Sequence, residues 1–438
     1  MDLAELSFDT IFAVASGGSR AAVAIMRVSG PGCGRVLDTL CHKRPPPRVA
    51  SLRPLRSVAG ELLDRALVLW FPRPHSYTGE DSVELHLHGG RAVTNAVADA
   101  LVGLGCRPAE AGEFTRRAFL NGRMDLLEAE AVADLVEAET TAQRAQALRQ
   151  LDGALGQLMR GWSARLVALL AQMEAVIDFP DEDLPPGVEA DVLAEITTLG
   201  REITTSIDDD RRGERLREGL VFAITGRPNV GKSTLVNALA EREVAIVAST
   251  PGTTRDILEA RVDLGGVPVT LLDTAGVRES DDPVEAEGVR RAMARAAEAD
   301  AVVVVLDATE AEFRGTSGAD DRPVVHVVNK IDISGSWSGQ GLGVSALTGE
   351  GLEDVRRALC GIAEDLTRSA GPAPLTRARH RAALIEAAER LRSACIAVLP
   401  ELRAEDLRLA LRAIGRVTGV VGVEEILGSV FRQFCIGK

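Results

Sequence analysis

Short hydrophobic runs separated by glycine- and proline-rich breaks fill the first part of the chain. The breaks include Ser29–Gly32 and Arg44–Pro47. Strand-like runs lie between them at Thr10–Val14, Ala22–Val28, Ala66–Phe71 and Ser82–His88. Such runs, bounded by turn residues, are typical of β-strands. The pattern predicts a compact α+β unit at the N-terminal end.

The run from Val83 to His88 alternates between apolar and polar residues. Because side chains alternate across a strand, Glu84, His86 and His88 share one face. A His-x-His pair could bind a metal ion, but no third ligand is near in the sequence. We favour the alternative, a half-buried strand whose polar side faces a ligand.

From Asp125 onward the hydrophobic spacing changes to three and four residues, which predicts a helix with one face toward a core. The residues of this stripe are Leu148, Leu151, Leu155, Leu158, Trp162, Leu166, Leu169, Met173 and Val176. The stripe predicts one long helix, ended by the acidic, proline-containing break Asp181–Pro186.

Further helices are predicted on both sides of a central stretch. One runs from about Glu189 to Asp210, and two, Leu375–Leu399 and Glu405–Thr418, follow a linker at Ser369–Pro374. Neither helical part is large enough to bury its apolar stripe alone. We expect the parts to pack together, with the central stretch inserted between them and its ends close in space.

The central stretch contains a complete G-x-x-x-x-G-K-[ST] phosphate loop, Gly226–Ser233. It stands between the apolar run Leu220–Ile224 and the helix-like run Thr234–Leu239, which is the context that the motif requires. Loop amides and the positive end of the helix can face phosphate oxygens. Lys232 can reach the outer phosphates, and the Ser233 hydroxyl can ligate Mg2+.

Most strand-like runs of the central stretch alternate with helices, and one hairpin joins Ile257–Leu264 to Val267–Leu272. This order predicts a mostly parallel sheet with helices on both faces. The expected fold class is multidomain, with an α+β N-terminal domain, an all-α helical domain and an inserted α/β P-loop domain. The expected domain boundaries are 1–122, 123–217, 218–367 and 368–438.

Further motifs identify the nucleotide as GTP. Asp273–Gly276 follows a strand-like run, and its aspartate can hold Mg2+ through water. Asn329–Asp332 also ends such a run, and the Asp332 carboxylate can accept two hydrogen bonds from guanine that adenine cannot donate. Ser345–Leu347 would close over the base, and Thr254 is a candidate second hydroxyl ligand for Mg2+.

The residue that orients the attacking water differs from that of many small GTPases. Val277 stands after Asp273–Gly276, where many small GTPases carry glutamine. Valine cannot orient water, so the carboxylates of the acidic stretch Glu279–Glu287 are the alternatives. The residues alone do not choose among them.

Composition fits a cytoplasmic globular protein. The 438 residues suit two or three domains, and 46% hydrophobic residues suffice for packed cores. The acidic start lacks the apolar core of a signal peptide, and the purest apolar run, Ala301–Leu306, is too short to cross a membrane. Without a C-x-x-C pair, zinc is not expected. The cysteines are Cys33, Cys41, Cys106, Cys360, Cys395 and Cys435.

The net charge of −14 argues against a simple nucleic-acid-binding protein. The charge is unevenly distributed: residues 1–122 carry +2, residues 123–370 carry −20 and residues 371–438 carry +4. If a polyanion docks, we expect it to meet the two ends of the chain.

Taken together, these segments resemble the MnmE (TrmE) family of bacterial tRNA-modification GTPases, from one end of the chain to the other. The GTPase motifs alone would fit several families, but the N-terminal blocks and the C-terminal tetrapeptide make the resemblance specific. Its marks are Asp9–Ile11, Thr78–Asp81, Glu84, His88–Gly90, Gly112–Phe114, Ala118–Asn121, Asp125–Leu126, Ala129–Ala131, Gly252–Asp256 and Cys435–Lys438.

The resemblance implies a folate-binding N-terminal domain that forms a homodimer, a helical domain and an inserted GTPase domain. It also implies a protein partner, the FAD protein MnmG (GidA), and tRNA as the substrate. The complex would install a carboxymethylaminomethyl-type group at carbon 5 of the wobble uridine of certain tRNAs. The one-carbon unit would come from 5,10-methylene- or 5-formyl-tetrahydrofolate.

The resemblance implies folate contacts at Arg27, Glu84, Arg123 and Lys438. A cation at Arg27 suits a carboxylate, and the Glu84 carboxylate suits the amine–amide edge of a pterin. Arg123 stands where the family has lysine, which keeps the charge but changes the donor geometry. For Cys435, the resemblance leaves open a reactive thiol in the modification or a buried structural residue.

In this family a potassium ion takes the place of an arginine finger, between paired GTPase domains. The resemblance implies K+ ligands at Asn229, Ala248, Thr250 and Thr253, and a water-orienting carboxylate at Glu285. A fixed cation there lowers the cost of developing negative charge. The full set of expected GTP-binding residues is Asn229, Val230, Gly231, Lys232, Ser233, Thr234, Ala248, Ser249, Thr250, Pro251, Gly252, Thr253, Thr254, Asp273, Thr274, Ala275, Gly276, Asn329, Lys330, Asp332, Ser345, Ala346 and Leu347.

Two other functions share parts of this pattern. A ribosome-assembly GTPase would use the same phosphate loop as a switch without tRNA-modification chemistry, but such proteins usually append an RNA-binding module, and none is visible in the sequence. A folate-dependent one-carbon transferase with an accessory GTPase domain is the third reading.

Overall fold

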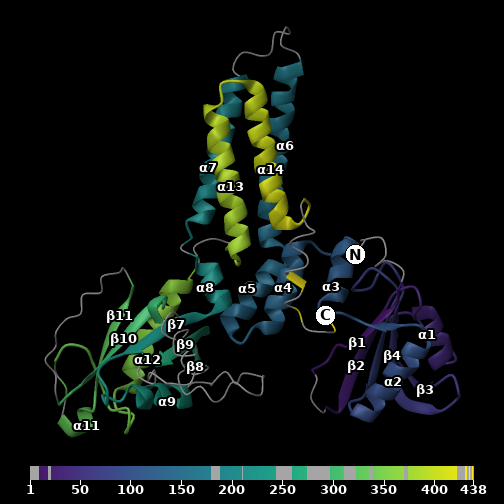
Figure 1. Cartoon of the computed structure of the whole chain (residues 1–438), viewed down its shortest axis with the longest axis horizontal. Helices are drawn as coiled ribbons and strands as arrows, with labels where there is room; N and C mark the ends of the chain where they lie inside the picture. The colour runs from purple at the N-terminus through teal and green to yellow at the C-terminus, as the bar shows by residue number, and fades with distance from the viewer. Residues whose placement is uncertain are drawn as a thin grey trace, which may run out of the picture. The chain divides into compact units, whose positions relative to one another are not determined.

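The structure is a computed structural model that describes residues 9–17, 21–178, 188–209, 211–242, 259–273, 296–309, 322–334, 337, 339–368, 373–421, 430, 431, 434 and 437. The chain forms two compact units. One consists of residues 1–133 and 414–438, and the other of residues 134–413. Each unit contains a six-stranded sheet (Figure 1).

The sheet of the first unit is antiparallel except at one edge, where β6 pairs in parallel with β1. Its spatial order is β3-β4-β5-β2-β1-β6. Helices α1 (Cys33–Leu40) and α2 (Arg91–Gly103) bury their apolar side chains against it, which confirms the predicted α+β unit. The strands are β1 (Ile11–Val14), β2 (Val23–Ser29), β3 (Ser51–Arg56), β4 (Leu62–Phe71), β5 (Ser82–His88) and β6 (Arg107–Pro108).

The sequence pattern misses β3 and predicts the start of β4 at Ala66 instead of Leu62. Strand β3 lies at the edge of the sheet, and Leu55 is its one fully buried residue. An edge strand needs little hydrophobic sequence and tolerates proline, here Pro54, because its outer N–H groups have no partner strand. The ordinary signals of a strand are therefore weak in this segment.

Two helices and the C-terminal residues complete the first unit. Helix α3 spans Glu113–Leu120, and α4 spans Leu126–Glu137. Phe431 and Phe434 pack with α4 residues in a small apolar cluster. Gly437 lies against β1, because a Cβ at that position would be 2.4 Å from the carbonyl oxygen of Val14. The end of the chain therefore returns to the N-terminal sheet.

The prediction of one long helix after Asp125 is wrong. The stripe is divided between α5 (Thr141–Leu151) and α6 (Ala154–Asp178). Gly153, with a φ of +83°, separates them in a backbone conformation that favours glycine. Leu148 is 41% exposed, so the stripe does not face one continuous core.

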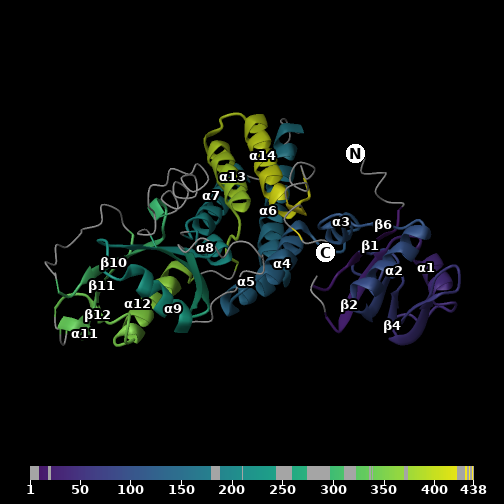
Figure 2. The ribbon, with the colours of Figure 1, turned by 60° about the horizontal axis from the view of Figure 1, so that its bottom comes forward.

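Helices from before and after the central stretch pack together, as predicted. Helix α7 (Val188–Ile207) contacts both α6 and α13 (Ala378–Ile396). Figures 1 and 2 show these three helices and α14 (Pro400–Thr418) running side by side. Arg403 on α14 pairs with Glu189 on α7 at 2.9 Å, so the two segments are joined by ionic as well as apolar contacts.

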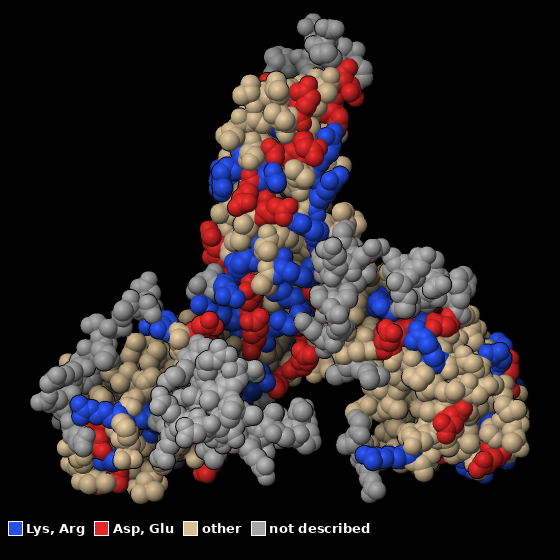
Figure 3. All heavy atoms as spheres, in the orientation of Figure 1, with Lys and Arg blue, Asp and Glu red and all other residues tan. Residues whose placement is uncertain are grey.

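Positive and negative side chains are interspersed along these helices (Figure 3). Arg165 pairs with Glu195 at 2.6 Å and with Glu202 at 2.5 Å. Pairs between exposed side chains contribute little to stability. They do divide the charge, so the face of the helices seen in Figure 3 does not present a field of one sign.

The sheet of the second unit is parallel except for β8, as the predicted hairpin requires. Its spatial order is β12-β11-β10-β7-β9-β8. Helices α9 (Lys232–Arg242) and α12 (Leu352–Thr367) pack against it around one apolar core. The strands are β7 (Leu220–Thr225), β8 (Glu259–Leu264), β9 (Val267–Asp273), β10 (Ala301–Asp307), β11 (Val324–Asn329) and β12 (Leu342–Val344).

The two ends of the segment that carries this sheet lie together. Gly213, in α8 (Arg212–Glu218), is so close to the returning chain that a Cβ would be 2.3 Å from the Leu375 carbonyl oxygen. Asp134 holds both sides, because Arg217 Nε donates to its Oδ1 at 2.9 Å and Arg377 Nη2 donates to the same atom at 2.7 Å.

Two absences hold for the described residues. Their helices include none with the length and apolar character needed to span a membrane. Within the same part of the chain, no three His, Cys, Asp or Glu side chains gather as a metal site. His86 and His88 therefore have no third ligand among these residues.

Candidate functional site

The phosphate loop joins β7 to α9 and needs glycine at two positions. Gly226 has a φ of +145°, and a Cβ there would be 2.2 Å from the Val305 carbonyl oxygen. Gly231 has a φ of +95°, and a Cβ there would be 2.2 Å from Asn329 Nδ2. Asn229, the predicted side-chain ligand for K+, is exposed and has a φ of +65°. The loop therefore packs closely on the ends of β10 and β11.

Lys232 is buried within the loop it follows. Its Nζ donates to the carbonyl oxygens of Gly226 at 2.8 Å and Arg227 at 2.7 Å. Burial lowers the pKa of Lys232, and the nearby Asp273 carboxylate partly offsets this effect. An ammonium held among carbonyl oxygens inside a glycine-rich loop is well placed to bind phosphate oxygens.

Two oxygen ligands meet beside Lys232. Ser233 Oγ on α9 lies 2.5 Å from Asp273 Oδ2 at the end of β9. Hydroxyl and carboxylate oxygens are the ligands that Mg2+ prefers, so this pair fits the ion. The predicted role of Asp273 and Ser233 in Mg2+ binding is consistent with their positions.

Asn329 connects the phosphate loop to the segment after β12. Its Nδ2 donates to the Val230 carbonyl oxygen at 2.8 Å, and its Oδ1 accepts from the Ala346 amide at 2.9 Å. Ser345 beside it is fully buried, and its Oγ accepts from the Thr348 amide at 3.2 Å. Three segments that the sequence assigns to one nucleotide site are therefore held together by one side chain.

The residues expected to contact the base lie at the same edge of the sheet. Asp332 is exposed in the first turn of α11 (Ile331–Ser334) and makes no hydrogen bond to a described residue. Leu347 is also exposed. Lys330 pairs with Asp307, which the sequence does not single out. Thr234 is exposed in the first turn of α9.

Several predicted site residues lie outside the described residues. They are Ala248, Ser249, Thr250, Pro251, Gly252, Thr253, Thr254, Thr274, Ala275, Gly276, Glu285, Cys435 and Lys438.

The first unit has a second candidate site on the face of its sheet. Arg27 on β2 and Glu84 on β5 are directly opposite each other in the antiparallel register. Arg27 Nη2 and Nε donate to Glu84 Oε1 at 3.0 and 3.2 Å. The guanidinium also lies 5.1 Å from the ring centre of Tyr77 and 5.8 Å from that of Phe114. Arg27 is therefore fixed by one carboxylate and two aromatic rings.

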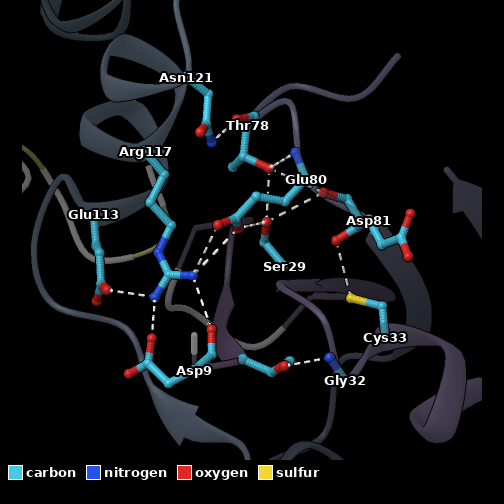
Figure 4. A network of polar contacts seen from close by, with 12 residues as sticks. Asp9, Ser29, Gly32, Cys33, Thr78, Glu80, Asp81, Glu113, Arg117 and Asn121 are labelled. Atoms are coloured by element: carbon cyan, nitrogen blue, oxygen red, sulfur yellow. Dashed lines mark hydrogen bonds and ion pairs between the residues drawn. The ribbon is translucent and has the colours of Figure 1, made fainter. Parts of the chain in front are cut away.

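The same unit contains an ionic network centred on the buried Arg117 (Figure 4). Arg117 on α3 is 4% exposed and pairs with Asp9 at 2.6 Å, Glu113 at 3.0 Å and Glu80 at 3.2 Å. The Glu80 carboxylate also accepts from Ser29 Oγ at 2.8 Å. These bonds fix the loop that carries Tyr77 and the helix that carries Phe114.

The network sets the charge of Glu113. Burial raises the pKa of this carboxyl, but hydrogen bonds from Arg107, the Glu110 amide and Arg117 outweigh that effect and leave the pKa below its ordinary value. Glu113 is therefore an ionised group in the interior, compensated by two arginines.

The other polar residues of this region lie at its margin. Arg123 is exposed, and its side chain passes over Gly79, where a Cβ would be 3.1 Å from Arg123 Cγ. His86 Nε2 is 3.6 Å from Glu84 Oε2. His88 is exposed and its Nδ1 lies 2.7 Å from Asp64 Oδ1. Glu84 and His86 thus share one face, as predicted. His88 contacts Asp64 on β4.

Sequence reasoning missed Tyr77, Phe114, Arg117 and Asp307 as parts of these sites. The available signal was the family blocks: Tyr77 precedes Thr78–Asp81, Phe114 belongs to Gly112–Phe114, and Arg117 precedes Ala118–Asn121. Asp307 ends the apolar run Ala301–Leu306, in the same position that Asp273 has after its own strand.

Comparison with known proteins covers nearly the whole chain. The family model of the MnmE helical domain matches residues 126–435, and that of the GTP-binding protein TrmE N-terminus matches residues 10–123. A tRNA modification GTPase MnmE of Gluconacetobacter diazotrophicus is 57% identical over 435 residues, with 98% of each chain covered. One of Granulibacter bethesdensis is 54% identical over 440 residues, covering 99% of this chain and 100% of the relative.

Solved structures match part of the chain. Era of Aquifex aeolicus, bound to GDP and AlF4-, is 24% identical with a TM-score of 0.25, covering 41% of this chain and 69% of that one. The FeoB G-domain of Methanococcus jannaschii is 22% identical with a TM-score of 0.24, covering 33% of this chain and 98% of that one.

Proposed function

This chain belongs to the MnmE family of tRNA modification GTPases, and from that premise we propose how it uses its two sites. It hydrolyses GTP with Mg2+ and acts in tRNA modification. We propose that K+ activates the hydrolysis, and that the chain, as a homodimer with the FAD protein MnmG, modifies carbon 5 of the wobble uridine of certain tRNAs. A tetrahydrofolate derivative would supply the one-carbon unit.

The main support is that one chain carries both a phosphate-binding edge and a separate polar site of matching chemistry. Lys232, Ser233 and Asp273 suit phosphates and Mg2+, while Arg27 and Glu84 lie on a different sheet. A GTPase switch without modification chemistry would need the first site and not the second.

The geometry of Arg27 and Glu84 supports binding of a pterin edge. Arg27 Nη1 and Glu84 Oε2 take no part in the hydrogen bonds between the two side chains, and Oε2 lies 3.6 Å from His86 Nε2. A pterin presents a carbonyl oxygen beside N–H groups, so a donor next to an acceptor is complementary to it. Because the two groups are paired at 3.0 Å, we assign both to the pterin and leave the distant glutamate tail to Arg123 or Lys438.

The proposed role of K+ is supported by the loop that would hold it. Asn229 is exposed in the phosphate loop, three residues before Lys232. A monovalent cation bound there would stabilise negative charge that develops during hydrolysis. Glu285 is the proposed water-orienting residue, since Val277 cannot serve.

Nucleoside analysis of tRNA tests the function as a whole. Cells that lack this chain are expected to lose the wobble-uridine side chain, and the wild-type chain should restore it. Glu84→Gln should fail to restore it, whereas Glu61→Gln, an exposed carboxylate at the β3–β4 turn, should succeed. Unchanged tRNA in the deletion strain would favour the ribosome-assembly alternative.

Turnover of GTP tests the cation. In the purified full chain, K+ should raise the rate by at least about tenfold over Na+. Asn229→Ala should remove most of this difference, while Asn237→Ala, an exposed residue of α9, should keep it. Glu285→Ala should abolish turnover with GTP still bound. Equal rates in the two salts would exclude the K+ mechanism.

Calorimetry with 5-formyl-tetrahydrofolate tests the folate site directly. The full chain should bind this compound, and Glu84→Gln should weaken binding by at least about tenfold, since a charged hydrogen bond is lost. Binding that is indifferent to both Arg27→Gln and Glu84→Gln would refute the site. Such a result would refute the folate site without bearing on the conclusion that the chain hydrolyses GTP.

A further inference from the structure

The carboxylate of Asp307 holds the ammonium of Lys330. Asp307 ends β10, and Asn329 ends β11 directly opposite it in the parallel register. Lys330 follows Asn329, and its Nζ lies 2.5 Å from Asp307 Oδ2. The Asp307 side chain is 9% exposed and that of Lys330 is 32% exposed. The pair therefore lies at the carboxyl ends of β10 and β11, where the Asp307 carboxylate is buried and the Lys330 side chain is partly exposed to solvent.

Asp307 is a fixed anchor. Its Oδ1 accepts from the Thr309 amide at 2.9 Å and from Thr309 Oγ1 at 2.7 Å. Burial raises the pKa of Asp307, but the hydrogen bonds from Lys330 and Thr309 outweigh it and leave the pKa below its ordinary value. The carboxylate is thus ionised at neutral pH and restrained on both oxygens.

The backbone at Lys330 is also constrained. Its φ of +69° lies in the left-handed region, which costs a residue with a side chain roughly 1–2 kcal/mol. The Asn329 carbonyl accepts from the Ala308 amide at 2.9 Å, and the Lys330 carbonyl accepts from the Ile333 amide at 3.1 Å. Such a conformation persists where its surroundings enforce it, and it is common at ligand sites.

The position of the ammonium limits what Lys330 can do. Because Nζ is bound to Asp307, the charge is turned toward β10 and is already neutralised. What remains for a ligand is the methylene stem, which long cationic side chains present as an apolar surface. Asp332, the predicted acceptor for the guanine edge, is exposed two residues further on.

We propose that Asp307 is a positioning residue for guanine nucleotides. By holding the Lys330 ammonium, it lays the methylene stem of Lys330 beside Asp332 as an apolar platform for the base. This role rests on the GTPase activity of the family and is independent of the K+ and folate proposals.

A double-mutant cycle on the full chain tests the inference. GDP binding is measured by calorimetry for wild type, Asp307→Asn, Lys330→Met and the double variant. Each single change should weaken binding by about tenfold, the scale expected for one lost charged hydrogen bond. The double variant should bind no more weakly than either single variant, because Asp307 acts through Lys330.

The kinetic signature separates positioning from chemistry. In Asp307→Asn the KM for GTP should rise about as much as the Kd for GDP, while kcat at saturating GTP stays within about twofold of wild type. An equal fall in kcat would place Asp307 in the chemical step and overturn the proposal.

The matched control is Asp300→Asn. Asp300 precedes the same strand at its opposite end, where it accepts from the Val221 amide at 3.0 Å and pairs with Arg215 at 3.2 Å. It should leave GDP affinity unchanged. If Asp307→Asn fails to fold, Lys330→Met alone decides, since unaltered GDP affinity in that variant would show that the Lys330 ammonium and its bond to Asp307 are not needed for binding. Additive losses in the double variant would also refute the inference.

Discussion

The two sheets assemble polar side chains in different ways. In the parallel sheet, Asp273, Asp307 and Asn329 each lie at the carboxyl end of a strand, so one edge collects them. In the antiparallel sheet, Arg27 and Glu84 lie within paired strands and meet through the register. The first arrangement serves a ligand at the rim of the sheet, and the second serves a ligand on its face.

The two regions also differ in how they are held. The N-terminal pair lies beside an ionic network centred on two buried charges, Arg117 and Glu113. At the nucleotide site, the neutral side-chain amide of Asn329 joins the phosphate loop to the segment after β12. Removing one member of a buried ionic set leaves an uncompensated charge, whereas removing a neutral bridge leaves two polar groups unpaired. We therefore expect unequal costs.

The largest effect is expected in the ionic network. Arg117→Met should destabilise the first unit by about 3–5 kcal/mol, because Glu80 loses its arginine partner and the buried Glu113 keeps only Arg107. Denaturant unfolding followed through the N-terminal unit would measure it. The exposed Arg65 gives the control, and Arg65→Met should change stability by less than about 0.5 kcal/mol. Equal, small effects would mean that the network does not support the fold.

A smaller effect, confined to ligand binding, is expected at the nucleotide edge. Asn329→Ala should weaken GDP binding by about thirtyfold, because the Val230 carbonyl and the Ala346 amide lose their shared partner. Calorimetry would measure the affinity, with Asn237→Ala on α9 as the control. If the affinity survives while the unfolding free energy drops by several kcal/mol, the comparison between the two regions would be reversed.

The pH dependence of stability should separate the two regions further. The pKa of Glu113 is lower in the folded chain than its ordinary value of 4.5. Its contribution is therefore complete above that value and is lost as the pH falls through the lower, folded-state pKa. Unfolding of the N-terminal unit between pH 7 and pH 3 should show this loss, and Glu113→Gln should flatten the dependence. An unchanged slope in this variant would assign the acid sensitivity elsewhere.

The smallest expected change concerns the thiols. Burial raises the pKa of Cys41 to about 11, with Arg53 partly opposing it, and burial also raises the pKa of Cys33 and of Cys106. These three thiols of the first unit should resist iodoacetamide at pH 7.5. Cys360 on α12 and Cys395 on α13 are more exposed and should react before these three, as peptide mass analysis would show. Early modification of Cys33 would indicate opening of the N-terminal core.

The contrast between the sheets explains what could be predicted from the sequence. At the edge of a parallel sheet, functional residues end an apolar run or follow it within a short loop, so short motifs predict Asp273, Asn329 and Lys232. The same logic applied to Asp307, but a lone aspartate after a strand carries no motif. Its role depends on its pairing with Lys330, which only the register of β10 and β11 establishes.

The N-terminal site could be named only through family resemblance. Arg27, Glu84 and Phe114 are far apart in sequence, and nothing local predicts that Arg27 lies over the rings. Arg117 and Glu113 have the spacing of an exposed helical ion pair, yet α3 packs them inside. Likewise, the stripe from Leu148 to Val176 has continuous helical spacing, and the turn at Gly153 interrupts it.

The shared anchor at Asp134 has a consequence for how this chain could be rebuilt. The polypeptide departs toward β7 after Arg217 and comes back just before Arg377, and both arginines grip the same carboxylate. Because the two ends of this segment meet at one carboxylate, we expect that a short turn could replace it while the helices before and after it stay packed together. We therefore expect that the nucleotide-binding part could be exchanged between relatives of this chain.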